Sequence, residues 1–123
     1  MAGETSPREI GERTFEYALR AIRLYRYLER NHDDAARIIG RQYLRSATSI
    51  GANVEESRAG VSRADFIHKV SIAQKEARES AYWLRLLRQS GSIAESKITP
   101  LLSETLEILA ILSAIIVKAR RNT

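Results

Sequence analysis

The sequence predicts an all-α protein, an antiparallel up-down-up-down four-helix bundle. Three observations support this prediction. The 123 residues include only two prolines and six glycines, and few runs of β-favouring residues. Four long stretches carry apolar residues at helical spacing, and short polar turns separate them. Short turns make consecutive helices antiparallel neighbours. We expect a single domain over residues 1–123, with helices at about 7–30, 34–59, 62–89 and 93–120.

The first expected helix opens with a capping signal. Ser6 can accept a hydrogen bond from a free backbone N–H, Pro7 suits the first helical position, and Glu9 completes a capping box. The apolar residues that follow fall within about half of the helix circumference. Acidic residues come first and arginines last, an order that complements the helix dipole.

The second expected helix follows a turn in which Asp33 or Asp34 can act as the cap. Its centre, Ser46–Ala52, is rich in small residues. Such residues weaken an isolated helix, but they allow another backbone to approach closely. We interpret this segment as a tight contact with the third helix. The alternative is a loop around Ser49–Gly51.

The third and fourth expected helices also carry start signals, Ser62 with Asp65 and Ser92 with Glu95. Pro100 either kinks the fourth helix or marks its true first turn. The core stripe expected on the third helix is Phe66, Val70, Ala73, Ala77 and Leu84. The core stripe expected on the fourth helix is Leu102, Leu106, Leu109, Leu112 and Ile116.

Both of these helices carry more apolar residues than one buried face requires. A helix of a monomeric bundle needs a single apolar stripe, so the surplus predicts a homo-oligomer. Trp83 has a second interpretation, in which it caps the edge of the core. We expect the subunit interface to include Ile72, Trp83, Leu86, Leu101, Ile108 and Ile115.

The charge balance is basic, with a formal net charge of +5 and a pI near 9.9. An excess of this size on a small domain favours anionic partners, with nucleic acid first. The alternative role of these bases is solubility and a match to the helix dipole. The expected phosphate contacts come from arginines of the first two helices, Arg20, Arg23, Arg26, Arg30, Arg37, Arg41 and Arg45.

Charged and amide side chains also alternate where the second and third helices are expected to meet. We interpret them as ion pairs that fix helix register rather than as an acid–base pair for catalysis. The expected polar network contains Arg45, Asn53, Glu56, Lys75, Glu76 and Arg78.

The sequence offers little for catalysis. It contains no cysteine, which excludes disulfides, thiol catalysis and zinc–thiolate sites. Glu29–His32 and Asp65–His68 resemble parts of a di-metal site, but in this bundle they fall at opposite ends, roughly 35–40 Å apart. We therefore expect no metal, no cofactor, no catalytic residues and no enzymatic activity.

The apolar segments give no sign of export or of a membrane. The first nine residues lack the apolar region of a secretory signal. The apolar run Ile108–Val117 is about half of the ~20 residues that span a bilayer. We expect a cytoplasmic protein with no membrane partner.

Two central segments resemble a known protein family. LRSATSIGANVEES (Leu44–Ser57) and SRADFIHKVSIAQKEARESAYWLRLL (Ser62–Leu87) are similar to the 23S rRNA-intervening-sequence proteins of bacteria, and ERTFEYALRAIRLYRYL (Glu12–Leu28) looks like the first helix of that family. The resemblance covers about residues 12–119. It implies a four-helix bundle that assembles as a ring-like homopentamer. A similar protein accompanies the reverse transcriptase of diversity-generating retroelements, so a reverse transcriptase or a ribosomal component is an implied partner.

Together these features predict a non-enzymatic, homo-oligomeric accessory protein of the rRNA-intervening-sequence type that binds RNA or DNA. The alternative is a protein–protein interaction scaffold without direct contact to nucleic acid. The resemblance supplies no catalytic residues that could be transferred to this chain.

Overall fold

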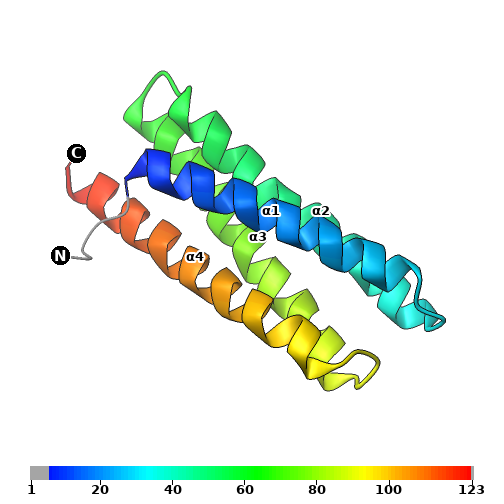
Figure 1. Cartoon of the computed structure of the whole chain (residues 1–123). Coiled ribbons are helices and arrows are strands. Elements are labelled where there is room, and N and C mark those ends of the chain that lie inside the picture. Colours follow the sequence, from blue (N-terminus) through cyan, green and yellow to red (C-terminus); the bar gives the residue numbers. More distant parts are fainter. Residues whose placement is uncertain (1–5, 123) are drawn as a thin grey trace.

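A computed structural model describes residues 6–122 of the chain, and this part contains four helices and no strand. The helices are α1 (Pro7–Glu29), α2 (Asp34–Arg58), α3 (Arg63–Gln89) and α4 (Glu95–Arg121). They run alternately up and down, as Figure 1 shows. Each helix boundary lies within two residues of the predicted position.

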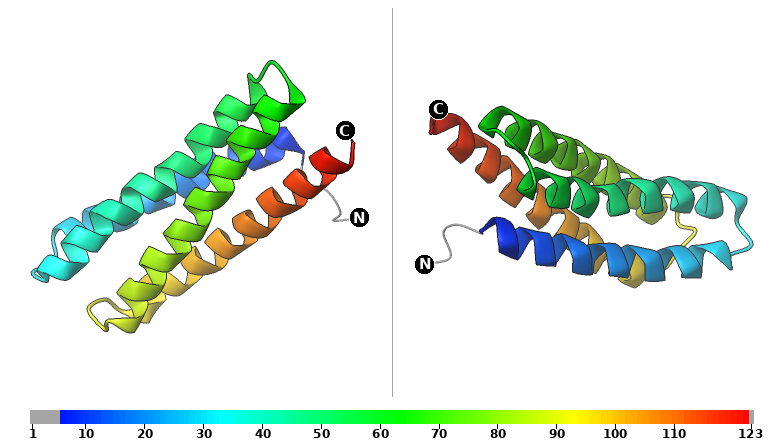
Figure 2. Two further views of the ribbon diagram at one scale, coloured as in Figure 1. Left: turned by 180° about the vertical axis from the view of Figure 1, so that it is seen from behind. Right: turned by 90° about the horizontal axis from the view of Figure 1, so that it is seen from above.

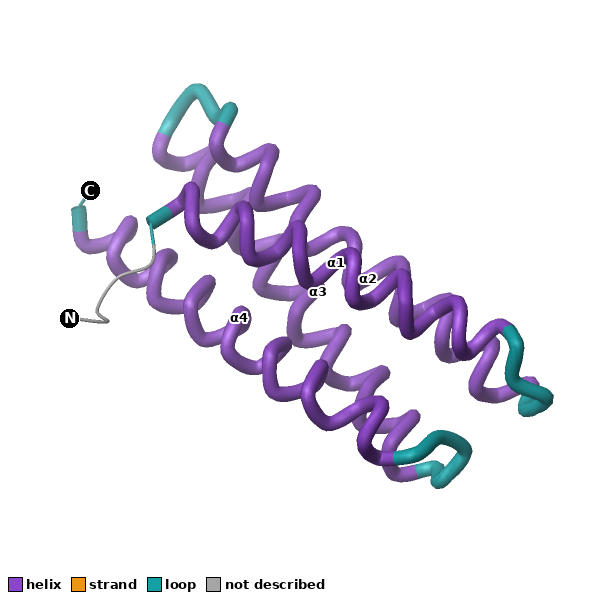
Figure 3. Tube along the Cα trace, viewed as in Figure 1, coloured by secondary structure: helices purple, strands orange, loops and turns teal. Residues whose placement is uncertain are grey.

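The turns place the chain ends and the α2–α3 turn at one end of the bundle. The α1–α2 and α3–α4 turns lie together at the other end, which Figure 3 shows as two neighbouring loops. Lys97, near the start of α4, lies 4.7 Å above the ring of Tyr27 near the end of α1. This cation–π contact joins the first and last helices at the two-turn end.

Three of the four predicted helix caps are present. Ser6 and Glu9 form a complete capping box, Asp33 accepts a hydrogen bond from the backbone N–H of Ala35 at 2.9 Å, and Ser62 accepts one from Asp65 at 3.1 Å. These signals are local in sequence, so they could be identified without knowledge of the tertiary fold.

The start of α4 differs from the prediction. Its N-cap is Ala94, which offers no side-chain hydrogen bond, so the expected capping box of Ser92 and Glu95 is absent. Pro100 lies inside the helix and not in its first turn, so the alternative in which it marks the helix start is wrong. Proline lacks a backbone N–H, so one bond of the ladder is missing at this point. The residue four positions earlier, Ser96, is exposed to solvent.

The core register of α4 also differs from the prediction. Its buried residues are Ile98, Leu101, Leu102, Thr105, Ile108, Leu112 and Ile116. Leu101 and Ile108, expected at a subunit interface, are only 4% and 0% exposed within the single chain, whereas Leu106 is 50% exposed. The buried face of α4 differs from the expected stripe because Thr105, a polar residue that the apolar pattern leaves out, occupies a core position. Its hydroxyl lies 2.5 Å from the Tyr17 hydroxyl and donates to the Leu101 carbonyl at 2.7 Å.

The small-residue segment of α2 is continuous helix, so the alternative of a loop is wrong. Its predicted tight contact with α3 is present at Ser46, whose hydroxyl lies 2.8 Å from that of Ser80. Gly51 faces α1 instead. A Cβ atom at Gly51 would lie only 3.3 Å from the backbone oxygen of Thr14. Small residues on α2 therefore allow two neighbouring helices, not one, to approach closely.

The helices do not pack equally closely. The contact between α2 and α3 is the most extensive in the bundle, and that between α1 and α4 is the least. Figure 2 (right) shows α4 crossing α1 obliquely, so that the end of α4 lies apart from the start of α1. Arg13 of α1 joins α4 through Glu104 and Glu107, with N–O distances of 2.6 Å to each.

Candidate nucleic-acid interface

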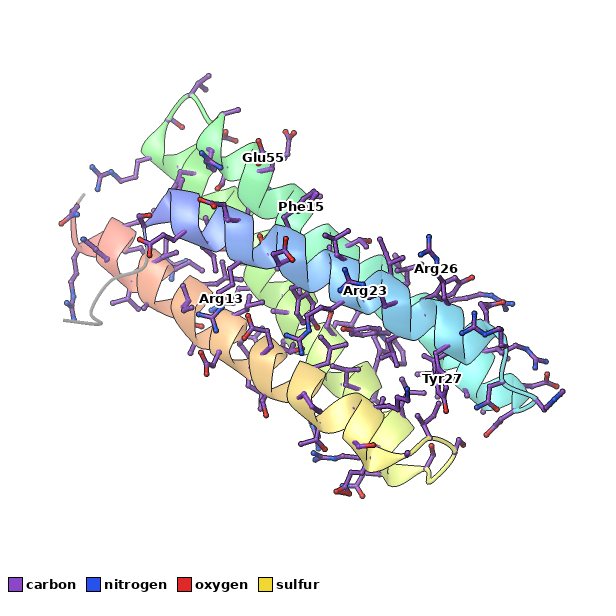
Figure 4. All side chains as sticks on the ribbon, viewed as in Figure 1. Arg13, Phe15, Arg23, Arg26, Tyr27 and Glu55 are labelled. Atoms are coloured by element: carbon purple, nitrogen blue, oxygen red, sulfur yellow. The ribbon has the colours of Figure 1, made fainter. Side chains whose placement is uncertain are left out.

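Three arginines form a basic strip, with Arg23 and Arg26 on the outer face of α1 and Arg30 at its C-cap. Arg23, Arg26 and Arg30 are exposed, and within residues 6–122 no carboxylate lies within ion-pair distance of them. At 100° and 1.5 Å per residue they lie within about 60° of one another and span about 10 Å along the helix. Figure 4 shows Arg26 on the side of α1 that faces away from α4. We call these three residues the α1 strip.

Arg20 was predicted to belong to the same surface, but it differs from the α1 strip in burial and in its proximity to α4. Arg20 is half-buried and close enough to Glu104 of α4 for its charge to act on that carboxyl. The pKa of Glu104 is lowered, chiefly by its hydrogen bond from Arg13, and the charge of Arg20 adds to the effect. Arg20 lies about 60° around the helix from Tyr17, whose hydroxyl contacts Thr105 of α4, so it lies on the side of α1 that faces α4.

The three predicted arginines of α2 each have a carboxylate partner. Arg37 pairs with Asp34, and also donates to the backbone oxygen of Asn31 at 2.5 Å. Arg41 lies 3.1 Å from Glu29, and Arg45 pairs with α3. Exposed pairs of this kind stabilise a protein by about 0–1 kcal/mol, so an approaching phosphate can replace the carboxylate at little cost. The α2 arginines therefore differ from the α1 strip, whose arginines have no carboxylate partner among residues 6–122.

The polar network at the α2–α3 junction is smaller than predicted. Arg45 lies 3.4 Å from Glu76, as expected, but it also pairs with Glu79, whose Oε2 accepts a hydrogen bond from the Trp83 indole N–H at 3.1 Å. Glu79 and Trp83 were not predicted members. A signal existed in the sequence, because residues 76, 79 and 83 are spaced by three and four along α3.

The other predicted members of that network do not join it. The Asn53 side-chain amide donates to the Ser49 backbone oxygen, 2.9 Å away on its own helix. Glu56, Lys75 and Arg78 are exposed. The predicted members lie close together along α2 and α3, which suggested a cluster. Successive residues of a helix point in directions about 100° apart, so only one side of each helix faces the α2–α3 junction.

Four of the six predicted interface residues are half-buried in the single chain, Ile72, Trp83, Leu86 and Ile115. Trp83 packs edge-on against Tyr82, with ring centroids 5.2 Å apart. The large apolar side chains that are exposed were not in the predicted set. They are Phe15, Ile38, Val61, Tyr82, Leu106 and Val117.

Titratable side chains inside the bundle have structural roles. The Tyr43 hydroxyl donates to that of Tyr17 at 2.9 Å, and Tyr17 in turn contacts Thr105. Burial raises the pKa of Tyr17 to about 12 and that of Tyr43 well above its usual value, so both phenols stay neutral. The sequence analysis did not predict this chain of hydroxyls.

The structure brings together no group of three or more His, Cys, Asp and Glu side chains that could hold a metal ion, as far as residues 6–122 are concerned. His32 and His68 are both exposed, one in the α1–α2 turn and the other near the start of α3.

The fold and this surface define a class, the small all-helical proteins of four antiparallel helices, here with an arginine strip on the first helix. The sequence model of the 23S rRNA-intervening sequence protein family matches residues 8–114, and the chain belongs to this family. The chain is also similar to a crystal structure of a protein with unknown function from the S23 ribosomal protein family of Bacteroides thetaiotaomicron VPI-5482. That protein is 38% identical, the match covers 87% of this chain and 97% of the other, and the TM-score is 0.81. The comparison with curated proteins gives no match.

Proposed function

We propose that this chain is a non-enzymatic, homo-oligomeric accessory protein that binds RNA or DNA through phosphate contacts in the cytoplasm. The observation that carries the proposal is the α1 strip, three exposed arginines without carboxylate partners among the described residues. Unpaired exposed guanidinium groups on one face attract phosphates and need not break an ion pair to do so.

The chemistry of the strip suits the nucleic-acid backbone rather than the bases. An arginine presents planar N–H groups that match a phosphate in two-point contacts. A face about 10 Å long meets only a few phosphates, so a single protomer would bind weakly. We therefore expect binding to be largely independent of sequence and to fall steeply with salt.

Homo-oligomerisation is the second part of the proposal. It is supported by the apolar side chains exposed on the single chain, including Phe15 at 64% and Leu106 at 50%. The family resemblance implies a homopentamer. In such a ring the strip is repeated in each subunit, and linked weak sites gain avidity by factors of about 10²–10⁴.

The test is a binding titration with labelled duplex DNA and labelled structured RNA at low salt. The variant R23E/R26E/R30E reverses the α1 strip, and the matched control K75E/R78E/R85E makes the same charge change on exposed residues of α3. We expect the strip variant to lose at least ten-fold in affinity and the control to lose much less. Failure of the native protein to bind either probe, or equal losses in both variants, would reject the proposal.

The alternative function, a scaffold that contacts other proteins only, is favoured by a different observation. The second half of α4 lines an open apolar groove with a volume of about 1170 Å³. The family resemblance suggests a reverse transcriptase or a ribosomal component as the protein partner. Recovery of such a partner that persists after nuclease treatment, and in the strip variant, would favour the scaffold.

A further inference from the structure

The open groove lies at the end of the bundle that holds the chain ends, away from the two-turn end. Its lining comes from the start of α3, including Arg63 and Phe66, and from the second half of α4, including Ile111, Ile115 and Val117. Clefts for small molecules enclose about 300–1,000 Å³ and bury most of the ligand. This groove is larger and open to solvent, so a segment of a macromolecule fits it better than a small molecule does.

The groove uses apolar surface that the bundle itself leaves uncovered. An 18-residue window of α4 has a mean hydropathy of 1.9, enough by length and composition for a membrane-spanning helix, yet only 33% of that window is buried. Val117 is 49% exposed, and Ala114 is exposed beside it in the groove. A helix face of this kind is stabilised when another apolar face covers it.

The charged residues that line the groove are all basic. They are Arg63, Lys118 and Arg121, and among residues 6–122 no acidic residue lines it. The Arg63 guanidinium donates to the backbone oxygen of Ala119 at 3.0 Å, which holds its charge beside the end of α4. Charge complementarity therefore favours an occupant with acidic side chains next to its apolar ones.

We infer that this groove binds the apolar face of an acidic amphipathic helix from a partner protein. Such a helix presents apolar residues at spacings of three and four to Phe66, Ile111 and Ile115, and its flanking carboxylates face Arg63 and Arg121. The α1 strip lies in the second half of α1, toward the two-turn end. Nucleic acid and the partner helix can therefore be bound at the same time, and the chain joins the two.

The experiment measures binding of the purified full chain to an 18-residue fluorescein-labelled helical peptide with leucine on one face and glutamate on the other. A matched peptide carries lysine in place of every glutamate. We expect the acidic peptide to bind at least ten-fold more tightly. Equal affinities, or no binding of the acidic peptide, would overturn the inference.

Variants locate the site. V117E and A114E introduce a negative charge at exposed groove positions and should each weaken acidic-peptide binding at least ten-fold. The control S103E, at an exposed position of α4 outside the groove, should leave it unchanged. Circular dichroism checks that each variant is folded. The strip variant R23E/R26E/R30E should bind the acidic peptide as the native chain does. Loss of peptide binding in the strip variant would show that the peptide merely binds the strip, and would overturn the groove assignment without affecting the proposed function.

Two other occupants are outcomes of the same experiment. If A114E and V117E convert an oligomer into monomers in light scattering, the groove holds a second copy of the chain and the inference is wrong. If vesicles of phosphatidylglycerol and phosphatidylcholine sediment the native chain and displace the peptide, the groove binds an anionic membrane surface, and the inference is again wrong. The inference is supported if the two variants keep the mass of the native protein, the vesicles do not bind the chain, and the acidic peptide binds selectively.

Discussion

The α2–α3 and α1–α4 contacts close the same bundle by different means. Between α2 and α3, small side chains that are fully buried allow a close approach, with the hydroxyls of Ser46 and Ser80 only 2.8 Å apart. Between α1 and α4, contact is least extensive, and the side chains of Arg13 and Tyr17 reach across to acidic and hydroxyl partners. The α2–α3 contact depends on the small volume of its side chains. The α1–α4 contact depends on a few polar side chains that reach from one helix to the other.

This difference has a functional consequence. A tightly packed contact cannot accept another element without a change of volume that costs stability. The contact held by polar groups leaves the second half of α4 only partly covered, and the apolar groove lies there. The bundle thus combines a closed side, which keeps α2 and α3 in register, with an open side where apolar surface of α4 is left uncovered.

The largest effect is expected from overfilling the closed side. S80L places a leucine where the Ser46 hydroxyl lies 2.8 Å away, in a position that is 0% exposed. Overpacking of this kind should lower the free energy of unfolding by about 2–3 kcal/mol. Urea denaturation measures the change. The control S103L, at an exposed position of α4, should change stability by less than about 0.5 kcal/mol. Similar values for the two variants would mean that the α2–α3 contact is not tightly packed.

An intermediate effect is expected from the buried chain of hydroxyls. Y17F removes the group that accepts from Tyr43 and contacts Thr105, so it leaves the buried Tyr43 hydroxyl without its acceptor. We expect a loss of about 2 kcal/mol in unfolding free energy. Y43F removes the donor but leaves the contact of Tyr17 with Thr105, so it should cost about 1 kcal/mol or less. Thermal or chemical denaturation of both variants tests this order, and a larger loss in Y43F would reverse it.

The smallest effect is expected from the ion pair of Arg13 and Glu104, which is partly open to solvent. At pH 7, E104Q should reduce the unfolding free energy by about 1 kcal/mol or less. The folded-state pKa of Glu104 is lowered from 4.5 by the hydrogen bond from Arg13, so the carboxylate stabilises the fold above pH 4.5. This contribution is lost as the pH falls through the lowered folded-state pKa.

Denaturation from pH 7 to pH 2.5 measures the difference between the native chain and E104Q. The difference should shrink on acidification below pH 4.5 and should also be smaller in high salt. E107Q is the matched control, because Glu107 contacts the same arginine but its side chain is 67% exposed. A difference that grows on acidification would contradict the assignment.

The parts of the fold that were predictable depend on residues close in sequence. Ser6, Asp33 and Ser62 define three helix starts by local hydrogen bonds, and the apolar spacing fixes which segments are helical. The register of α4 was not predictable in this way. Thr105 is polar, and its place in the core depends on the hydroxyl of Tyr17, 88 positions away in the chain.

The candidate site was also predictable only in part, because its ion pairs depend on residues that are distant in sequence. The sequence identifies the arginines of α1 and α2, but only tertiary packing decides which of them meet a carboxylate. Arg41 meets Glu29 of the neighbouring helix and Arg45 meets Glu79, whereas Arg23 remains exposed without a carboxylate partner. The groove depends on how the start of α3 packs beside the second half of α4, a property of helix packing that periodicity does not contain.

The measurement that tests the central claim most directly is the salt dependence of duplex binding. Each phosphate contact contributes about 0.9 to the slope of log K against log salt concentration. Removal of the charges of Arg23, Arg26 and Arg30 by substitution with glutamine should therefore reduce the magnitude of the slope by roughly 3 for each protomer in contact. A strip variant whose slope equals that of the native protein would contradict the claim that these arginines bind the phosphate backbone.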